Sequence, residues 1–422
     1  MKEELLQYLW RHRYFPSKGL KTTDGDAVEV LDQGRLNPDA GPDFFNARIR
    51  VGDTLWAGNV EVHLRSSDWQ KHGHQHDSAY RNVILHVVET CDRPIQIDNR
   101  DLPCMVLPID AAIQMKYDSL LDSRDWLACR DDFQKVDSTL LRIWMHRLMI
   151  ERLENKTESI IHELQLTSGN WNETFYRFIA RNFGFRVNAV PFELLARSLP
   201  LAVLGHHSDN SFQIEALLFG QSGLLYSEPS EDDYFHALKR EYEFLAVKYK
   251  LQPVAGHLWK FLRLRPVNFP TVRIAQFAAL ISQSHGLFSK IIEAPDFSEL
   301  KKLFQVRTSE YWDTHFSFRS ESVERLKNLG RDAFENLVVN SVVPFLFVYG
   351  EHANRQDLKD RSLEMLEQLH LEDNVKIRAW SEMGIDCRSA FESQALLELR
   401  NEYCEKKKCL NCQIGNKILI NA

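Results

Sequence analysis

The sequence predicts a mixed α/β (or α+β) domain at the N-terminus, a large mainly α-helical domain after it, and a helical C-terminal region with a cysteine cluster. Three observations support this fold class. Short apolar runs separated by turn residues dominate 1–110, apolar residues recur at helical spacing over 138–350, and helical spacing continues over 351–422, where the last four of the seven cysteines lie. These three ranges are the expected domains.

The expected order of elements in the first domain is helix, strand, hairpin, short helix and strand. The amphipathic segment KEELLQYLW predicts the helix, and Gly52-Asp53 predicts the hairpin turn. NVILHVVET is apolar enough for a strand in the middle of a sheet. The other expected elements are a strand and turn over 27–36, hairpin strands over 45–51 and 54–64, a short helix around 77–80, and strands at 93–97 and 105–109.

Helical spacing organises the second domain, where Ser138 is a suitable N-cap for a helix over 139–164. The chain of 422 residues is 44% hydrophobic, enough for two or three domains with cores, and its net charge of -7 excludes a strongly basic nucleic-acid coat. We find no apolar run of about 18 residues and a charged N-terminal segment, so we expect no membrane span and no signal peptide. An odd cysteine count favours reduced or metal-bound thiols in the cytoplasm.

The hairpin strand over 54–64 carries the first group of chemically useful side chains. Side chains alternate along a strand, so Glu61 and His63 share a face. Asp43 starts the preceding strand, and two carboxylates suit Mg²⁺ or Mn²⁺. We therefore expect Asp43, Glu61 and His63 to lie within a few ångströms of one another on an open face of the sheet. The alternative is a polar edge hairpin in which Asp43 caps a turn.

Pro42-Asp43 followed by Glu61-Val62-His63, on a hairpin preceded by a helix, resembles the signature of the PD-(D/E)XK nuclease superfamily. The resemblance implies a nuclease-like sheet in which Asp43 and Glu61 hold the metal, assisted by Glu29 or by a glutamate of the first helix. His63 stands where the superfamily has lysine. A neutral imidazole can ligate a metal or accept a proton, but it supplies no fixed ammonium for a phosphate.

The chain as a whole is similar to a family of large bacterial proteins of unknown function. The stretches that carry this similarity are NPDAGPDFFNARIRVGDTLWAGNVEVHLRSSDW, NVILHVV, NWNETFYRFIARNFGFRVNAVPFELLAR, IEALLFGQSGLL, RLRPVNFPTVRIAQFA and YCEKKKCLNCQIG. The similarity implies a bacterial cytoplasmic protein and implies no activity.

Three histidines follow the hairpin at alternate positions: His72, His74 and His76. In an extended segment they would share one face, a spacing that suits Zn²⁺ or Mn²⁺. Gly73 favours a solvated loop instead. A turn at Asp77 would direct both His74 and Asp77 toward the hairpin.

The C-terminal cysteines Cys404, Cys409 and Cys412 have the spacing C-x4-C-x2-C. C-x2-C is a spacing that zinc and iron–sulfur clusters both favour, because two thiolates on a tight turn converge on one centre. Cys387 precedes an amphipathic helix that could deliver it as the fourth ligand, with His352 as an alternative. The other interpretation is a set of ordinary reduced thiols in a basic tail.

Three classes of function follow. The first is a metal-dependent nuclease or phosphodiesterase, with Asp43 and Glu61 on the metal and His63 activating water. The second is a zinc-dependent hydrolase that uses His63, His74 and His86, where His86 is otherwise a hydrogen-bonded core histidine in its apolar strand. The third is a non-catalytic scaffold that binds nucleic acid or protein through a degenerate nuclease fold.

The stretch HLWKFLRLRPVNFPTVRIAQF, residues 257–277, mixes basic and aromatic side chains. Such mixing suits phosphate contact and base stacking. It suits equally a contact between helices in which the arginines pair with acidic residues. The sequence leaves both interpretations open.

Overall fold

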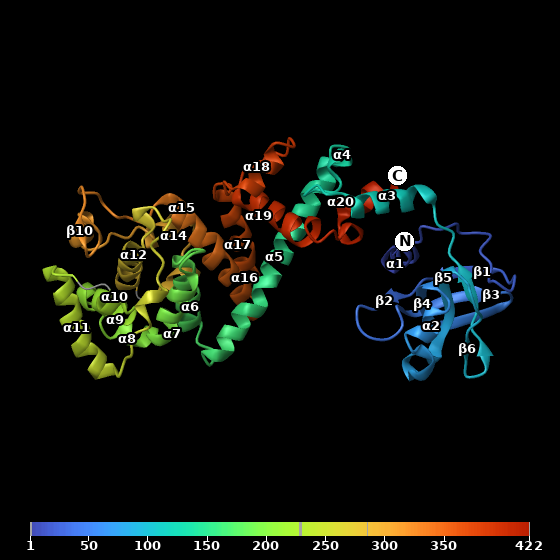
Figure 1. Cartoon of the computed structure of the whole chain (residues 1–422), viewed down its shortest axis with the longest axis horizontal. Coiled ribbons are helices and arrows are strands. Elements are labelled where there is room, and N and C mark those ends of the chain that lie inside the picture. The colour runs from blue at the N-terminus through green and yellow to red at the C-terminus, as the bar shows by residue number, and fades with distance from the viewer. Residues whose placement is uncertain (1, 228–229, 285, 422) are drawn as a thin grey trace. The chain divides into compact units, whose positions relative to one another are not determined.

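The computed structural model describes residues 2–227, 230–284 and 286–421. Contacts divide the chain into two compact units, which we call the N-terminal unit (Met1–Trp144 with Leu399–Ala422) and the helical unit (Met145–Glu398). The expected order, a mixed sheet followed by a mostly helical part, is confirmed (Figure 1). The region expected over 351–422 is divided at Leu399, because the end of the chain packs into the core of the N-terminal unit.

The sheet of the N-terminal unit has the strand order β1-β3-β4-β5-β8, and β2 pairs with β3. β1, β3 and β4 are antiparallel, whereas β4, β5 and β8 are parallel. A tight turn at Gly52 and Asp53 joins β3 to β4, while the parallel pair β4–β5 needs a longer crossover. The strands are β1 (Val28–Asp32), β2 (Arg35–Leu36), β3 (Phe44–Val51), β4 (Thr54–Arg65), β5 (Val83–Thr90), β6 (Gln96–Ile97), β7 (Arg100–Asp101) and β8 (Cys104–Val106).

Helix α1 (Glu3–Arg11) packs against β4 and buries one apolar face, which includes Leu5, Leu6 and Trp10, in the core that also holds Val60 and Val62. The crossover between β4 and β5 consists of α2 (Asp68–Lys71) and two 3-10 turns, η1 (His74–His76) and η2 (Ser78–Asn82). Its buried Trp69 and Tyr80 form a second, smaller apolar cluster with the start of β5. The crossover therefore covers side chains that the alternation of β4 directs away from the main core.

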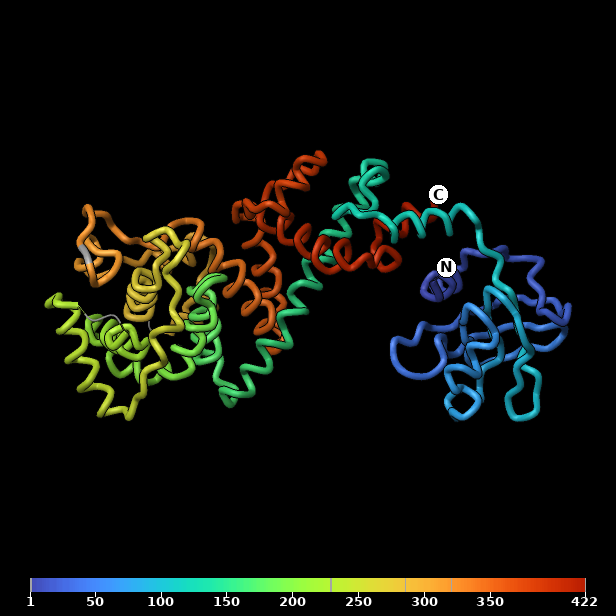
Figure 2. The backbone as a smooth tube through the Cα atoms, in the orientation of Figure 1, coloured from blue at the N-terminus to red at the C-terminus, as the bar shows by residue number. Residues whose placement is uncertain are grey.

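Both ends of the chain contribute helices to the N-terminal unit. α3 (Ala111–Asp122) and the short α4 (Arg130–Phe133) lie beside α20 (Gln413–Ile420), so the end of the chain returns to the segment that follows the sheet (Figure 2). The returning segment also contains the π-helix η7 (Leu399–Cys404) and the 3-10 turn η8 (Cys409–Asn411). Helix α5 (Ser138–Leu166) begins in this unit and continues into the next.

The helical unit is built around one large apolar core. Its helix α9 (Ser211–Gln221) is buried over most of its length, and its buried residues are mostly apolar but include Glu215 and Gln221. Its helices are α6 (Trp171–Phe183), α7 (Ala189–Ser198), α8 (Leu201–Gly205), α9 (Ser211–Gln221), α10 (Leu224–Ser227), α11 (Asp233–Tyr249), α12 (Pro270–Gln283), α13 (Leu287–Glu293), α14 (Phe297–Leu303), α15 (Arg331–Leu337), α16 (Val343–His352), α17 (Gln356–Gln368), α18 (Val375–Ser381) and α19 (Ala390–Glu398). Short turns η3 (Gly256–Leu258), η4 (Pro266–Asn268) and η5 (Glu310–Asp313), the π-helix η6 (Val338–Val342), and strands β9 (His315–Ser317) and β10 (Ser320–Glu321) complete it.

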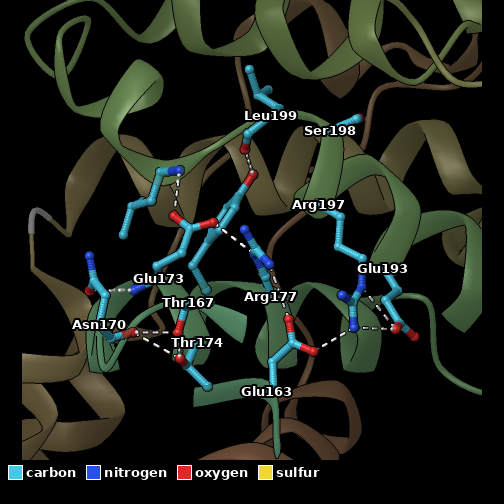
Figure 3. Close-up of polar contacts among 12 residues, drawn as sticks. Glu163, Thr167, Asn170, Glu173, Thr174, Arg177, Glu193, Arg197, Ser198 and Leu199 are labelled. Carbon is cyan, nitrogen blue, oxygen red and sulfur yellow. Dashed lines mark hydrogen bonds and ion pairs between the residues drawn. The ribbon is translucent and has the colours of Figure 1, made fainter. Parts of the chain in front are cut away.

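A network of charged residues joins the first helices of this unit (Figure 3). Glu163 of α5 accepts hydrogen bonds from Arg177 of α6, at 3.2 Å, and from Arg197 of α7. Arg177 also donates to Glu173, at 2.8 Å, and Glu173 accepts from the backbone of Leu201. Glu163 is 8% exposed, so little water reaches its carboxylate. The two arginines supply the positive charge that stabilises it instead.

The continuous helical run Arg331–His352 is the one described segment that is long and apolar enough to cross a membrane by length and composition. Within its most apolar window, 72% of the residues are buried inside the structure. Such burial is what a core helix of a folded domain shows.

Candidate histidine–carboxylate site

Glu61 and His63 leave the same face of β4, as alternation requires. The structure brings them together with Asp43, but the expectation of an open face is wrong. Glu61 is 4% exposed and His63 is 1% exposed, because the crossover from Ser66 to Asn82 lies over this face and buries Trp69 against it. An alternating pattern identifies which side chains share a face, and it does not say what covers that face.

The pairing of β3 with β4 sets Asp43 beside Glu61, since the next residue, Phe44, is opposite Val60. The Asp43 N–H donates to Glu61 Oε2 at 3.0 Å, and the Val62 N–H donates to Asp43 Oδ2 at 3.0 Å. Gln7 Nε2 of α1 donates to the other oxygen, Oδ1, at 2.9 Å. Both Asp43 oxygens thus hold a donor, whereas Glu61 Oε1 is turned toward the histidines.

Burial controls the ionisation of these two carboxyl groups. It raises the pKa of Asp43 to about 7, with the neighbouring Glu61 adding to the effect, and it raises the pKa of Glu61 to about 8. Glu3 of α1 adds negative charge near Glu61. Burial, and after it the charge of Asp43, raises the pKa of Glu3 as well. A bound cation would stabilise the ionised form of these carboxyl groups.

Two histidines approach the free oxygen of Glu61. His63 Nε2 lies 3.4 Å from Oε1, and His74 Nε2 lies 3.3 Å from it. His72 Nδ1 lies 3.2 Å from His63 Nε2, and candidate ligand atoms of His63, His72 and His74 all lie within 4.8 Å of one another. Gly73 has a positive φ of 80°, so 72–76 turns rather than extends; this turn brings His72 and His74 together and leaves His76 exposed.

These separations fit a first-row transition metal. Ligands that lie about 2.0–2.1 Å from a tetrahedral ion are about 3.3–3.4 Å from one another. The pairs Glu61–His63 and Glu61–His74 have this spacing, and the pair His63–His72, at 3.2 Å, is slightly closer. Imidazole nitrogens and one carboxylate oxygen are ligands that Zn²⁺ and Mn²⁺ accept.

His86 supports His63 from the neighbouring strand. β5 places it opposite Glu61, and His86 Nε2 lies 2.9 Å from His63 Nδ1. Burial, followed by the charges of other histidines, lowers the pKa of His63 to about 2 and that of His86 to about 4. Both rings are therefore neutral at physiological pH, which is the form that ligates metals.

The other expected site residues lie elsewhere. Glu29 of β1 forms an ion pair with Arg50, which lies opposite it in the register of β1 and β3. This pair is at the end of β3 away from Asp43, and both side chains are about half exposed. A glutamate of the first helix, Glu3, is the one near the cluster. Asp77 is exposed, and its side chain caps η2 by accepting the Ala79 N–H at 2.9 Å.

Three contributing residues were not expected from the sequence. Gln7 holds Asp43, Tyr80 stacks on His74 with ring centroids 3.8 Å apart, and Trp69 contacts both His74 and His86. A signal for Gln7 exists, because it is a polar residue among the buried residues of α1. The aromatic residues lie in an irregular segment where no periodic pattern assigns a face.

The cysteines are also distributed differently from the expectation. Cys404, Cys409 and Cys412 lie in the N-terminal unit, whereas Cys387 lies in the helical unit, where its electrostatic neighbours are the carboxylates Glu392 and Asp386. Cys129 is the cysteine that lies near Cys404, Cys409 and Cys412. Its thiol is influenced electrostatically by those of Cys412 and Cys409. The sequence distance between Cys129 and the tail concealed this proximity.

Fold and site together define a protein with a mixed-sheet unit that carries a buried histidine–carboxylate cluster, and with a separate helical unit. The chain belongs to the family described as protein of unknown function (DUF2851), whose model matches residues 3–375. The comparison with curated proteins gave no match, and the comparison with solved structures gave none. The matched range includes the cluster and Cys129 and ends before Cys387.

Proposed function

We propose that the N-terminal unit is a metal-dependent hydrolase that cleaves phosphodiester bonds in nucleic acid, with the ion held by Glu61, His63 and His74. The observation that carries the proposal is the spacing of 3.3–3.4 Å from Glu61 Oε1 to the two imidazole nitrogens. That spacing suits a shared ion better than a set of isolated hydrogen bonds, because both imidazoles are in the form that ligates metals.

The ligand set favours Mn²⁺ or Zn²⁺ over Mg²⁺. Mg²⁺ prefers oxygen ligands in octahedral geometry, whereas this site offers nitrogen from several imidazoles. Asp43 contributes by orientation rather than as the main ligand, since donors from Gln7 and Val62 already occupy its oxygens. The exposed His72 is the ring that a substrate or water displaces most readily.

A bound ion would supply a Lewis acid that stabilises charge on a phosphoryl oxygen and lowers the pKa of water. The residues of the chain prepare the site for it. The Asp43 N–H fixes one oxygen of Glu61, so that Oε1 faces the imidazoles. His86 fixes the orientation of His63 through Nδ1 and leaves Nε2 directed at the site. The exposed His72 lies with its Nδ1 3.2 Å from that Nε2.

The choice of phosphodiester as substrate rests on the order of elements. α1 precedes the antiparallel strands β1, β3 and β4, and a covered crossover leads to the parallel β5. Acidic residues precede β3 and occupy the middle of β4. This arrangement is what the resemblance to PD-(D/E)XK nucleases implies, and it supports a nucleic-acid substrate.

A hydrolase acting on another type of bond is the second candidate. The observation that favours it is the chemistry of position 63, where a buried imidazole replaces the ammonium that would contact a phosphate. Zinc hydrolases commonly use histidine and glutamate ligands of this kind. Their substrates include esters and amides as well as phosphates.

The test is cleavage of single-stranded, double-stranded and branched nucleic acids by the full chain with Mn²⁺, Zn²⁺ or Mg²⁺. We expect Mn²⁺- or Zn²⁺-dependent cleavage that falls about 100-fold or more in Glu61→Gln and His74→Ala, because each removes a ligand. His76→Ala, which changes an exposed histidine of the same turn, should retain activity. Cleavage that persists in Glu61→Gln, or metal binding without cleavage of any nucleic acid, would contradict the proposal.

A further inference from the structure

We propose that Cys129, Cys404, Cys409 and Cys412 form a four-thiolate metal centre that fastens the returning C-terminal segment to the N-terminal unit. Zinc ions and iron–sulfur clusters are both bound by four cysteine thiolates, so either could occupy this centre. This centre is separate from the histidine–carboxylate cluster and does not depend on its function. Cys129 takes the position that the sequence pattern had assigned to Cys387.

Contacts between short elements bring these thiols together. η7 ends at Cys404 and contacts η8, which begins at Cys409. Cys412 is the N-cap of α20, which contacts α4, and Cys129 is the N-cap of α4. Each cysteine thus lies at the end of an element, and the elements touch in pairs.

The backbone at the start of α20 packs tightly against that of Cys409. A Cβ atom on Gly415 would lie 2.2 Å from the carbonyl oxygen of Cys409, so only glycine fits at this position. Burial raises the pKa of the Cys412 thiol, whereas the backbone N–H groups of Gly415 and Ile414 act in the opposite direction. Amides at a helix N-terminus stabilise a thiolate, which is the form a metal requires.

Two long side chains hold the returning segment against the region around Cys129. Lys407 Nζ donates to the carbonyl oxygens of Leu121, at the end of α3, and of Ser123, the latter at 2.9 Å. The Arg400 guanidinium lies over the Trp126 ring, 4.3 Å from its centroid. These contacts lie on either side of Cys404 in the sequence and are independent of the thiols.

The thiols influence one another electrostatically. Burial, followed by Cys412 and Cys409, raises the pKa of Cys129 to about 12, and burial followed by Cys412 and Cys129 raises the pKa of Cys404. This mutual influence indicates that the four thiols lie in one neighbourhood, as the contacts between their elements also do.

The spacing of the thiols bears on the size of the centre. Sulfurs that surround one zinc ion at about 2.3 Å are about 3.8 Å apart. Among the described residues, the group whose ligand atoms all lie within 4.8 Å consists of histidines, not of these cysteines. A single zinc ion would require these sulfurs to lie closer together than the structure has them, whereas an iron–sulfur cluster holds its thiolates on several metal ions.

The test measures zinc, iron and acid-labile sulfide in the full chain purified without added metal under anaerobic conditions. We expect iron with sulfide, or zinc, at one centre per chain, lost in Cys129→Ser and retained in Cys387→Ser. Because Cys129→Ser could fail to fold, alkylation of the unmutated protein before and after chelation provides a second readout. Chelation should expose Cys129, Cys404, Cys409 and Cys412 together. Absence of metal, or chelation that exposes Cys387 in place of Cys129, would overturn the proposal.

A second, independent observation concerns a cleft of about 900 Å³ in the helical unit. We infer that it binds a phosphate group carried by a nucleotide or by a nucleic-acid strand. The charged residues among those that line it are Arg265, Arg273, Arg325, Lys327, Arg331 and Asp332. Five cationic residues against one acidic residue make the cleft suitable for an anion.

Arg273 carries the inference. It is 8% exposed, and among the described residues its guanidinium donates to two neutral amides, those of Gln276 at 2.8 Å and Asn268 at 2.6 Å. Its Nε has no hydrogen-bond partner in the described part of the chain, and burial lowers its pKa to about 10. A buried cation without a carboxylate partner is costly, so an external anion would stabilise it. The paired-arginine interpretation of this stretch therefore does not apply to Arg273.

Phosphate is the anion that these groups suit best. Arginine binds phosphate through parallel hydrogen bonds, and the Arg273 guanidinium also lies over the Phe185 ring at 4.5 Å, where a base could stack beside it. Arg265 and Arg325 are exposed at the same cleft and can contact further phosphates. The volume accommodates a nucleotide.

The test compares ATP, pyrophosphate and a fluorescent single-stranded oligonucleotide as ligands of the full chain. We expect Arg273→Gln to weaken binding at least about 10-fold, and Arg265→Ala with Arg325→Ala to reduce its salt dependence. Arg263→Ala, an exposed arginine outside the lining, is the matched control. Tight ATP binding would identify a nucleotide site, and tight oligonucleotide binding a strand site. Binding that is unchanged in both Arg273→Gln and the double variant, or no binding of any of the three, would overturn the inference.

Discussion

Glu61 and His63 show at the scale of single residues how burial sets chemistry. With almost no exposed surface, each loses the water that would stabilise its charged form. Burial raises the pKa of Glu61 to about 8 and lowers that of His63 to about 2, so a neutral acid lies beside a neutral imidazole at pH 7. A divalent ion reverses the balance for Glu61, because it provides the positive charge that this part of the protein lacks.

The two histidines of the turn should differ in their effect on metal affinity. His74 is partly buried and lies 3.3 Å from Glu61 Oε1, whereas His72 is exposed. We expect His74→Ala to lower Mn²⁺ or Zn²⁺ affinity by about 100-fold and His72→Ala by about 10-fold, measured by isothermal titration calorimetry. Equal losses of metal affinity would show that both rings contribute equally as ligands, contrary to this prediction.

Glu215 of α9 provides a pH prediction away from the site. It is 4% exposed and accepts a hydrogen bond from Trp312 at 2.6 Å, and burial raises its pKa above 4.5. The folded protein therefore holds this proton more tightly than the unfolded chain does. Its stabilising contribution is present below pH 4.5 and is lost as pH rises through the folded pKa.

Urea unfolding of the unmutated protein and of Glu215→Gln at about pH 4 and about pH 7 measures this contribution. Between the two pH values, the unmutated protein should lose more unfolding free energy than the variant does. The comparison of differences removes any constant effect of the substitution. An identical pH dependence in both proteins would show that Glu215 does not titrate as its burial requires.

At the scale of elements, β4 and its crossover show what sequence can and cannot predict. Alternation along a strand is enough to assign Glu61 and His63 to one face. It does not predict the cover over that face, because the crossover lacks a periodic pattern and turns at Gly73. The expectation that Glu29 assists the site failed for another reason. Its pairing with Arg50 depends on the register of β1 against β3, which neither strand's sequence determines alone.

The charged network between α5, α6 and α7 should stabilise the helical unit. Glu163→Ala removes the carboxylate that accepts hydrogen bonds from both Arg177 and Arg197, and leaves each arginine with one glutamate partner, Glu173 or Glu193. We expect a loss of about 2 kcal/mol in unfolding free energy, less than for a fully buried pair because Arg197 is partly exposed. Glu158→Ala, at an exposed position of the same helix, should cost little. Equal effects would show that the network contributes nothing specific.

At the scale of the whole molecule, the chain forms two compact units, and its end returns to the first. The order of a mixed sheet before helices was predictable, because helical and strand periodicities differ along the sequence. The return was not, since a contact between Cys129 and a tail some 275 residues later leaves no local pattern. The family match reaches residue 375 and likewise gives no indication of it.

Two units with separate cores should unfold separately. We expect two transitions in scanning calorimetry of the full chain, one lowered by chelation of the thiol centre and the other lowered by Glu163→Ala. Each change acts on contacts within one unit, which is why each should leave the other transition in place. A single transition that both changes lower equally would contradict this division of the molecule.

The most direct measurement for the central claim is the number of Mn²⁺ ions bound per chain, determined by electron paramagnetic resonance. Mn²⁺ prefers oxygen and nitrogen ligands, so it reports on the histidine–carboxylate cluster and not on the thiols. We predict one tightly bound ion in the unmutated protein and in Glu29→Gln, whose carboxylate pairs with Arg50 outside the cluster, and none in Glu61→Gln. Unchanged Mn²⁺ binding in Glu61→Gln, or no tight binding in the unmutated protein, would contradict the account.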